Sequence, residues 1–124
     1  MFETLPAYGF FCRHVTNLNL KTINLDVMAP DYRPAIICDD VERLDIDDVD
    51  AAIHAEAPCY LSFVNVRDAA VINCRPLGDC STFLKVDQAS KNVALYANDT
   101  RRIKKLVHPG RAAGVFIGNR NMGK

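Results

Sequence analysis

FFCRHVTNLNLKTI, at residues 10–23, indicates the architecture of the protein, because the chain repeats it. IICDDVERLDIDDV follows at an offset of 26, at residues 36–49, and LSFVNVRDAAVINC at a further offset of 25, at residues 61–74. A fourth, weaker copy begins near Leu84. Such a period indicates a repeat architecture, in which each unit buries its apolar side only against its neighbours.

Short runs within each copy alternate apolar and polar residues, for example LNL at residues 18–20 and LDI at residues 44–46. This is the period of a strand that is buried on one face. No segment of helical length shows helical spacing alone, so the sequence predicts an all-β fold. We expect a right-handed parallel β-helix of about four coils, whose equivalent residues stack about 4.8 Å apart.

A leucine-rich repeat is the competing architecture, because its V-x-x-L-x-L core is matched from Val15 onwards. That repeat also needs asparagine or cysteine at one fixed position and a helical half. The position is mostly not asparagine, since the successive copies hold Ile23, Val49, Cys74 and Asn98 there. The parallel β-helix is therefore the preferred prediction.

We expect one domain over residues 1–124. Residues 1–9 are interpreted as a lead-in or cap, and residues 10–98 as the coils. Residues 99–124 are expected to form a C-terminal basic loop, irregular up to residue 110, and a capping strand at residues 113–117. A short stack with two open ends exposes strand edges. We therefore expect a homo-oligomer, most simply a dimer, through the coil ends or through exchange of the last strand.

The composition argues against several classes of partner. Fifteen basic and fifteen acidic residues give no net charge, so nothing favours nucleic acid. No apolar run approaches the roughly 18–20 residues of a membrane span, and no signal peptide is visible. Residues 45–50 are rich in aspartate but lack the glycine and final glutamate of a calcium-binding EF-hand loop. We expect no metal and no cofactor.

Five cysteines cannot all pair within one chain. Cys12 and Cys38 occupy the same repeat position, which predicts a stack of small buried thiols. A bridge from Cys80 to either Cys59 or Cys74 stays open from the sequence alone.

Stacking the copies also sets polar residues of neighbouring coils side by side. Opposite charges at such positions favour this register, although an exposed pair contributes only about 0–1 kcal/mol. Three pairs are predicted between the first two copies: Arg13 with Asp39, His14 with Asp40, and Lys21 with Asp47.

LPAYGFFCRHV at residues 5–15 and RPAIICDDV at residues 33–41, with VNVRD and NCRP further on, resemble a known family. They are similar to the C-terminal coils of polygalacturonase-like β-helix proteins, glycoside hydrolase family 28, over roughly residues 5–99. The resemblance implies a right-handed parallel β-helix that contacts pectin-type, uronic-acid-rich polysaccharide. It also implies a secreted or periplasmic location, which the sequence itself leaves unknown.

Enzymes of that family carry Asn-Thr-Asp, Asp-Asp, Gly-His-Gly and Arg-Ile-Lys motifs, in that order. Here Asp39 and Asp40 resemble the second motif, and Arg102 to Lys104 the fourth, but the other two are absent. Adjacent aspartates on a strand are also expected to point to opposite faces. We therefore expect a catalytically incomplete chain with a scaffold or carbohydrate-contacting role.

Two alternatives stay open. In one, Asp39 or Asp40 acts in glycoside cleavage, and Arg102 and Lys104 are further catalytic candidates. In the other, the chain is a protein-interaction module. Carbohydrate contact is assigned to the basic run after the fourth copy, because arginine and lysine form charge-assisted hydrogen bonds with carboxylates. Its candidates are Arg101, Arg102, Lys104 and Lys105.

Overall fold

The computed structural model describes residues 8–27, 29, 31–108 and 115–117, and these residues contain strands and no helix. Within them the strands are β1 (Phe10–Leu25), β2 (Ile36–Ala52), β3 (Leu61–Ile72), β4 (Arg75–Leu77), β5 (Cys80–Val86), β6 (Lys91–Tyr96), β7 (Ile103–His108) and β8 (Val115–Ile117). All the pairs that these strands form are parallel. The described part of the chain has no helix suited to crossing a membrane, and no helical half of a leucine-rich repeat.

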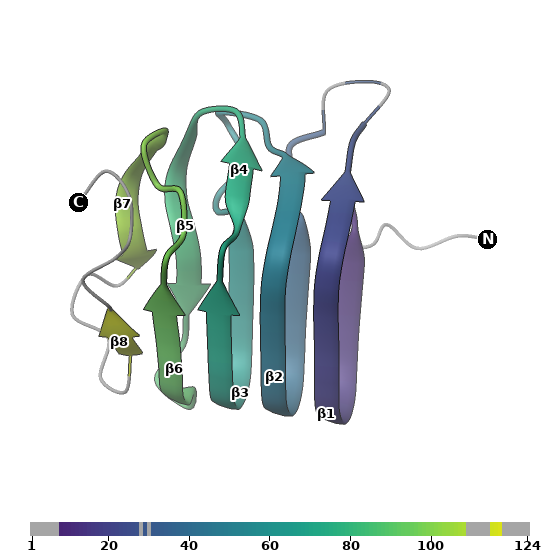
Figure 1. Ribbon diagram of the computed structural model, residues 1–124, viewed down its shortest axis with the longest axis vertical. Coiled ribbons are helices and arrows are strands. Elements are labelled where there is room, and N and C mark those ends of the chain that lie inside the picture. The colour runs from purple at the N-terminus through teal and green to yellow at the C-terminus, as the bar shows by residue number, and fades with distance from the viewer. Residues whose placement is uncertain (1–7, 28, 30, 109–114, 118–124) are drawn as a thin grey trace.

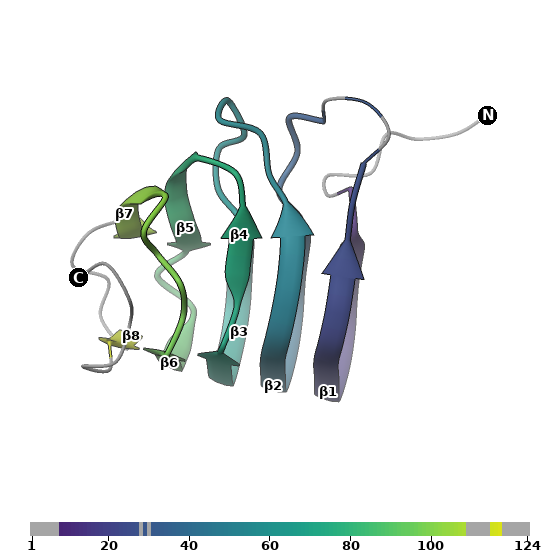
Figure 2. The same cartoon turned by 45° about the horizontal axis from the view of Figure 1, so that its top comes forward.

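The strands wind into a right-handed parallel β-helix of about four coils, as predicted. In Figures 1 and 2 the chain descends at the back of each coil and turns at the lower edge. It then rises in front and passes over the top into the next coil. β1 and β2 each wrap around both sides of the stack, with the turn inside the strand.

The repeat register of the sequence is confirmed. Phe10 pairs with Ile36, 26 positions later, and Ile36 pairs with Leu61 after 25 positions. The fourth copy does begin at Leu84, which pairs with Leu61. The last described strand, β8, pairs with β6 at an offset of only 22 positions. Successive coils therefore become shorter toward the C-terminus.

Corners of the coils are made by residues with positive φ. Each of these residues follows a residue that also lies outside the core. Asp40, for example, follows Asp39. A residue in the left-handed conformation interrupts the inward–outward alternation of side chains along a strand. Both side chains therefore stay outside the core while the chain turns. Asparagine, aspartate and histidine tolerate this conformation best, and they hold most of the positions. In the first three coils these are His14, Asn17, Thr22, Asp40, Arg43, Asp48, Asn65, Asp68 and Asn73.

The core is a set of apolar columns that run through the stack. Leu44 and Val66, in the second and third coils, are fully buried. Their counterparts Val15 and Leu18 in the first coil are only partly buried, although they belong to the same columns. The first coil packs against the second on one side, and no described residue forms a further coil on its other side.

Asn98 is a polar exception inside this core. It is fully buried, in the column that holds Ile23, Val49 and Cys74 in the earlier coils. Its side-chain oxygen accepts a hydrogen bond from the Cys74 backbone N–H at 3.0 Å, and its side-chain amide donates to the Val71 carbonyl at 3.0 Å. The side chain thus bonds to the backbone of the neighbouring coil just after β6 has ended.

The C-terminal part differs from the sequence prediction. Residues 99–110 were expected to be an irregular basic loop, but Ile103–His108 forms β7 and pairs with β5. Ile103 and Val107 turn inward and are buried, so two apolar residues among basic ones suffice for a strand that lies on a formed stack. The coils therefore continue past residue 98. Of the strand expected at residues 113–117, Val115–Ile117 is described, as β8.

Of the expected lead-in, residues 8 and 9 are described and the rest lies outside the described residues. The backbone N–H groups of Tyr8 and Gly9 donate to the carbonyls of Pro34 and Ala35, each at 3.1 Å. This end of the lead-in therefore continues the pairing of the first coil with the second rather than covering the outer side of the first coil.

Candidate functional site

Asp39 and Asp40 both lie outside the core, contrary to the expectation that they would point to opposite faces. Their side chains are 30% and 38% exposed, respectively. The reason is the corner: Asp40 has a φ of 57°, which interrupts the strand alternation between the two residues. The two carboxyl groups then enter different interactions. Asp39 pairs with Arg13 of the first coil at 3.4 Å.

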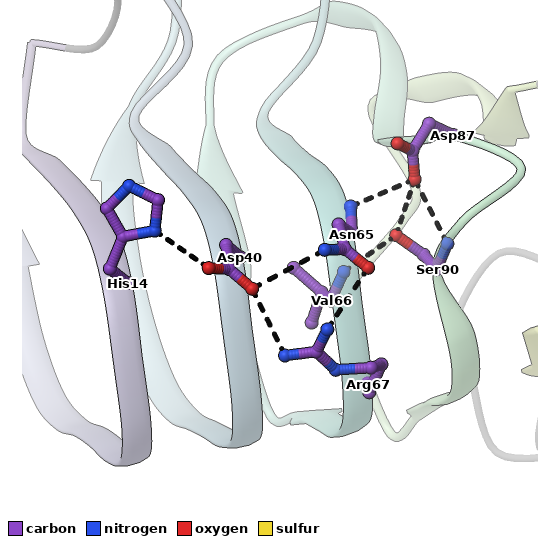
Figure 3. A network of polar contacts seen from close by, with 7 residues as sticks. All are labelled: His14, Asp40, Asn65, Val66, Arg67, Asp87 and Ser90. Carbon is purple, nitrogen blue, oxygen red and sulfur yellow. Dashed lines mark hydrogen bonds and ion pairs between the residues drawn. The ribbon is translucent and has the colours of Figure 1, made fainter.

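Asp40 accepts hydrogen bonds from three side chains on the two neighbouring coils, one from the first coil and two from the third (Figure 3). His14 Nδ1 lies 2.7 Å from one carboxylate oxygen, and Asn65 Nδ2 and Arg67 Nη2 lie 3.4 and 3.2 Å from the other. The His14 hydrogen bond, with help from Arg67, lowers the pKa of Asp40 despite some desolvation. Asp40 is therefore an ionised carboxylate with its oxygens occupied, which suits a structural acceptor and not a proton donor.

Asp87, which follows β5 in the fourth coil, binds the corresponding corner of the third coil (Figure 3). One of its oxygens accepts from the Asn65 N–H at 3.0 Å and from the Ser90 hydroxyl at 2.8 Å. The Ser90 hydroxyl oxygen in turn accepts from the Val66 N–H at 3.0 Å. Although desolvation raises it, the pKa of Asp87 is lowered overall by the hydrogen bonds from Asn65 and Ser90. Asp87 and Ser90 thus accept hydrogen bonds from the backbone N–H groups of Asn65 and Val66, in place of a neighbouring strand.

Of the three pairs predicted between the first two coils, two are in contact and the third is aligned in the strand register without contact. Arg13 meets Asp39 and His14 meets Asp40. Lys21 is the register partner of Asp47, but no ion pair joins the two in the part of the chain that the structure describes. These residues form a surface ladder of the kind the repeat predicts.

A basic groove lies on the upper part of the stack, where the fourth coil passes to β7. It is a surface depression of about 600 Å³, lined by Arg75, Pro76, Leu77, Asp99, Arg101 and Arg102. Two of the arginines have acidic partners: Arg75 Nη2 lies 2.9 Å from Asp50, and Arg101 Nη2 lies 2.7 Å from Asp99. Among the described residues, no carboxylate lies within ion-pair distance of Arg102.

Three of the four predicted carbohydrate-contacting residues line this groove or the depression beside it. Arg101, Arg102 and Lys104 line an adjoining depression of about 400 Å³, together with Asp79 and Ser81. Lys105 is exposed on β7 but lines neither depression. The side chain of Arg101 is fixed by two hydrogen bonds to Asp99, at 2.9 and 2.7 Å, which also raise the pKa of its guanidinium.

The predicted catalytic candidates do not come together. Asp39 and Asp40 lie on β2, whereas Arg102 directly precedes β7 and Lys104 lies on it. β7 is three strands from β2 in the sheet, about 14 Å at the usual strand spacing of about 4.8 Å. The described residues therefore place no single acid–base site around these four side chains.

Sequence reasoning missed the acidic partners of the groove arginines and the role of Arg75. A signal for them was present, because the repeat offset of 25 that aligns the second and third copies also sets Asp50 beside Arg75. The next coil brings Asp99 against Cys74, with a backbone hydrogen bond of 2.9 Å. Extending the alignment past the apolar positions would have found this polar column.

Within the described residues, no group of three or more histidine, cysteine, aspartate or glutamate side chains could hold a metal ion. Comparison of the chain with protein-family models, with curated proteins and with solved structures gave no match.

Proposed function

We propose that this protein is a β-helix scaffold that contacts acidic polysaccharide through the basic groove at Arg75, Arg101 and Arg102. The observation that carries the proposal is the surplus of positive charge there. Three arginines and one aspartate line the groove, and one of those arginines, Arg102, has no carboxylate partner among the described residues.

Uronic-acid-rich polysaccharide fits this groove chemically. A planar guanidinium can bind a carboxylate through two parallel hydrogen bonds, which makes arginine a specific partner for a uronate group. Leu77, 46% exposed, adds an apolar surface beside the arginines that can contact the face of a sugar ring. The resemblance of residues 5–99 to polygalacturonase-like coils supports the same class of ligand.

Binding of the full chain to polygalacturonate tests this function. We expect Arg102→Gln to weaken binding about 10–100-fold, because a charge-assisted hydrogen bond contributes about 1.5–3 kcal/mol and each 1.4 kcal/mol is tenfold. Arg43→Gln is the matched control, since Arg43 is an exposed arginine on β2, away from the groove. Calorimetry or gel-retardation with the polysaccharide measures the difference.

Methyl-esterified polygalacturonate provides the second control, because esterification removes the carboxylate charges and keeps the sugar chain. We expect it to bind weakly to wild type. Equal binding of both polymers, or equal losses in the two glutamine variants, would contradict the proposed site. Release of reducing ends that Asp40→Asn abolishes would instead establish the alternative function, glycoside hydrolysis.

A second candidate role, assembly with another copy of the chain, is favoured by the first coil. Its inward positions carry the same kinds of residue as the buried positions of the second coil, yet Val15, Leu18 and Ile23 are only partly buried. A terminal coil that faces water would need a polar outer side.

Light scattering at micromolar concentration tests this assembly. We expect a dimer, joined through the first coils or by exchange of the C-terminal strand β8, because two-fold pairs are the commonest closed assembly. A single species at the chain mass of 13.8 kDa, unchanged on dilution, would exclude it.

A further inference from the structure

Cys12 and Cys38 face each other inside the first two coils. They are direct partners in the parallel pairing of β1 with β2, and both belong to the core side of their strands. Paired residues of neighbouring strands lie about 4.8 Å apart, which is within the usual Cα separation of disulfides, about 4.4–6.8 Å.

We propose that Cys12 and Cys38 form a reversible disulfide by exchange with a small-molecule disulfide such as oxidised glutathione, and that this bond ties the first coil to the second. The register of β1 and β2 already sets the two residues opposite each other, so the bond requires the two side chains to approach and no change of register. β1 can make that movement because, among the described residues, a neighbouring strand packs on only one side of it.

The two cysteines have unequal environments that suit this exchange. Cys12 is partly exposed, whereas Cys38 is fully buried. The hydrogen bond from Cys38 lowers the pKa of Cys12 to about 7, although burial raises it. Cys12 is therefore substantially a thiolate near neutral pH, and the thiolate is the form that attacks a disulfide.

Attack by the Cys12 thiolate on oxidised glutathione forms a Cys12–glutathione mixed disulfide and releases one glutathione thiolate. The hydrogen bond to Cys12 and burial hold the pKa of Cys38 above its usual value, and the first of these causes disappears once Cys12 is capped. Cys38 then loses its proton to solvent and attacks the Cys12 sulfur. That step releases the second glutathione, so two thiols are oxidised and one small disulfide is reduced to two thiols.

The other three cysteines lack this combination. Cys59, Cys74 and Cys80 are all buried, and burial raises the pKa of each thiol. Cys59 and Cys80 interact with each other electrostatically, so a bond between them is the internal competitor that an experiment must distinguish.

The test is to incubate the full chain with mixtures of oxidised and reduced glutathione, then to count free thiols and map the linked peptides by mass spectrometry. We expect the loss of two of the five thiols, no retained glutathione, and one cross-link between the peptides of Cys12 and Cys38. Excess reduced glutathione should restore all five thiols.

Three variants sharpen the result. Cys38→Ser should keep one glutathione on Cys12, Cys12→Ser should lose no thiol, and the control Cys74→Ala should react like wild type. If a serine variant fails to fold, the peptide map of the wild type still decides. A cross-link between Cys59 and Cys80, glutathione retained by the wild type, or five thiols left at the most oxidising mixture would each overturn the proposal.

Discussion

The Leu44→Ala variant is expected to have a free energy of unfolding about 2–5 kcal/mol below that of wild type. Leu44 is fully buried in the second coil, between Leu18 of the first coil and Ala69 of the third. Truncation removes apolar contacts and leaves a cavity. Its neighbour Ala69 is too small to fill that cavity, so the loss should lie away from the lower end of the range. Urea denaturation followed by circular dichroism measures it.

Asp45→Ala is the matched control for that variant. Asp45 is the next residue of the same strand, it is exposed, and no ion pair of its side chain is found in the described part of the chain. We expect its unfolding free energy to change by no more than about 0.5 kcal/mol, as for most surface substitutions. The reverse ranking would mean a register shifted by one residue, because such a shift exchanges the two faces of a strand.

The second large effect is expected at Asn98. Replacement by leucine keeps the size of the side chain but leaves the Cys74 N–H and the Val71 carbonyl without their partners inside the core. An unsatisfied buried group costs about 1–3 kcal/mol, so we expect Asn98→Leu to lower the free energy of unfolding by about 2–6 kcal/mol. The other coils hold apolar residues at this position. If apolar packing alone mattered there, Asn98→Leu would instead raise the free energy of unfolding.

The same substitution at an exposed site separates these two interpretations. Asn24→Leu on β1 makes the identical chemical change on the surface and should alter the unfolding free energy by no more than about 0.5 kcal/mol. If Asn98→Leu proved as stable as wild type while Asn24→Leu behaved as expected, the two hydrogen bonds of Asn98 would carry no net stability. Both variants can be compared by the urea unfolding experiment used for Leu44→Ala.

The stacking register could be predicted from the sequence because the period of the apolar positions fixes it. Val15, Val41 and Val66 lie in one column, as their spacing of 26 and 25 residues requires. The corners were harder to predict, since an alternating pattern does not show where a residue adopts positive φ. The frequent aspartate and asparagine residues after an outward neighbour, such as Asp40 and Asn65, were the available signal.

The candidate site could be predicted less well, for physical reasons. Local charge suggested a loop for residues 99–110, but packing of Ile103 and Val107 on the preceding coil made a strand there. Arg101 and Arg102 were identified from their charge alone. Asp99 lies only two residues before Arg101 in the sequence, but Arg75 belongs to the preceding coil and joins these residues only through stacking.

The shortening of successive coils gives the molecule a taper. The first two coils repeat after 26 residues, and the last described pairing, between β6 and β8, repeats after 22. If copies were added head to tail, the short last coil of one copy would meet the long first coil of the next. That mismatch would recur at every junction of a growing filament. Two wide ends match each other. For copies that associate by their ends, the taper therefore favours a closed pair and opposes a fibre.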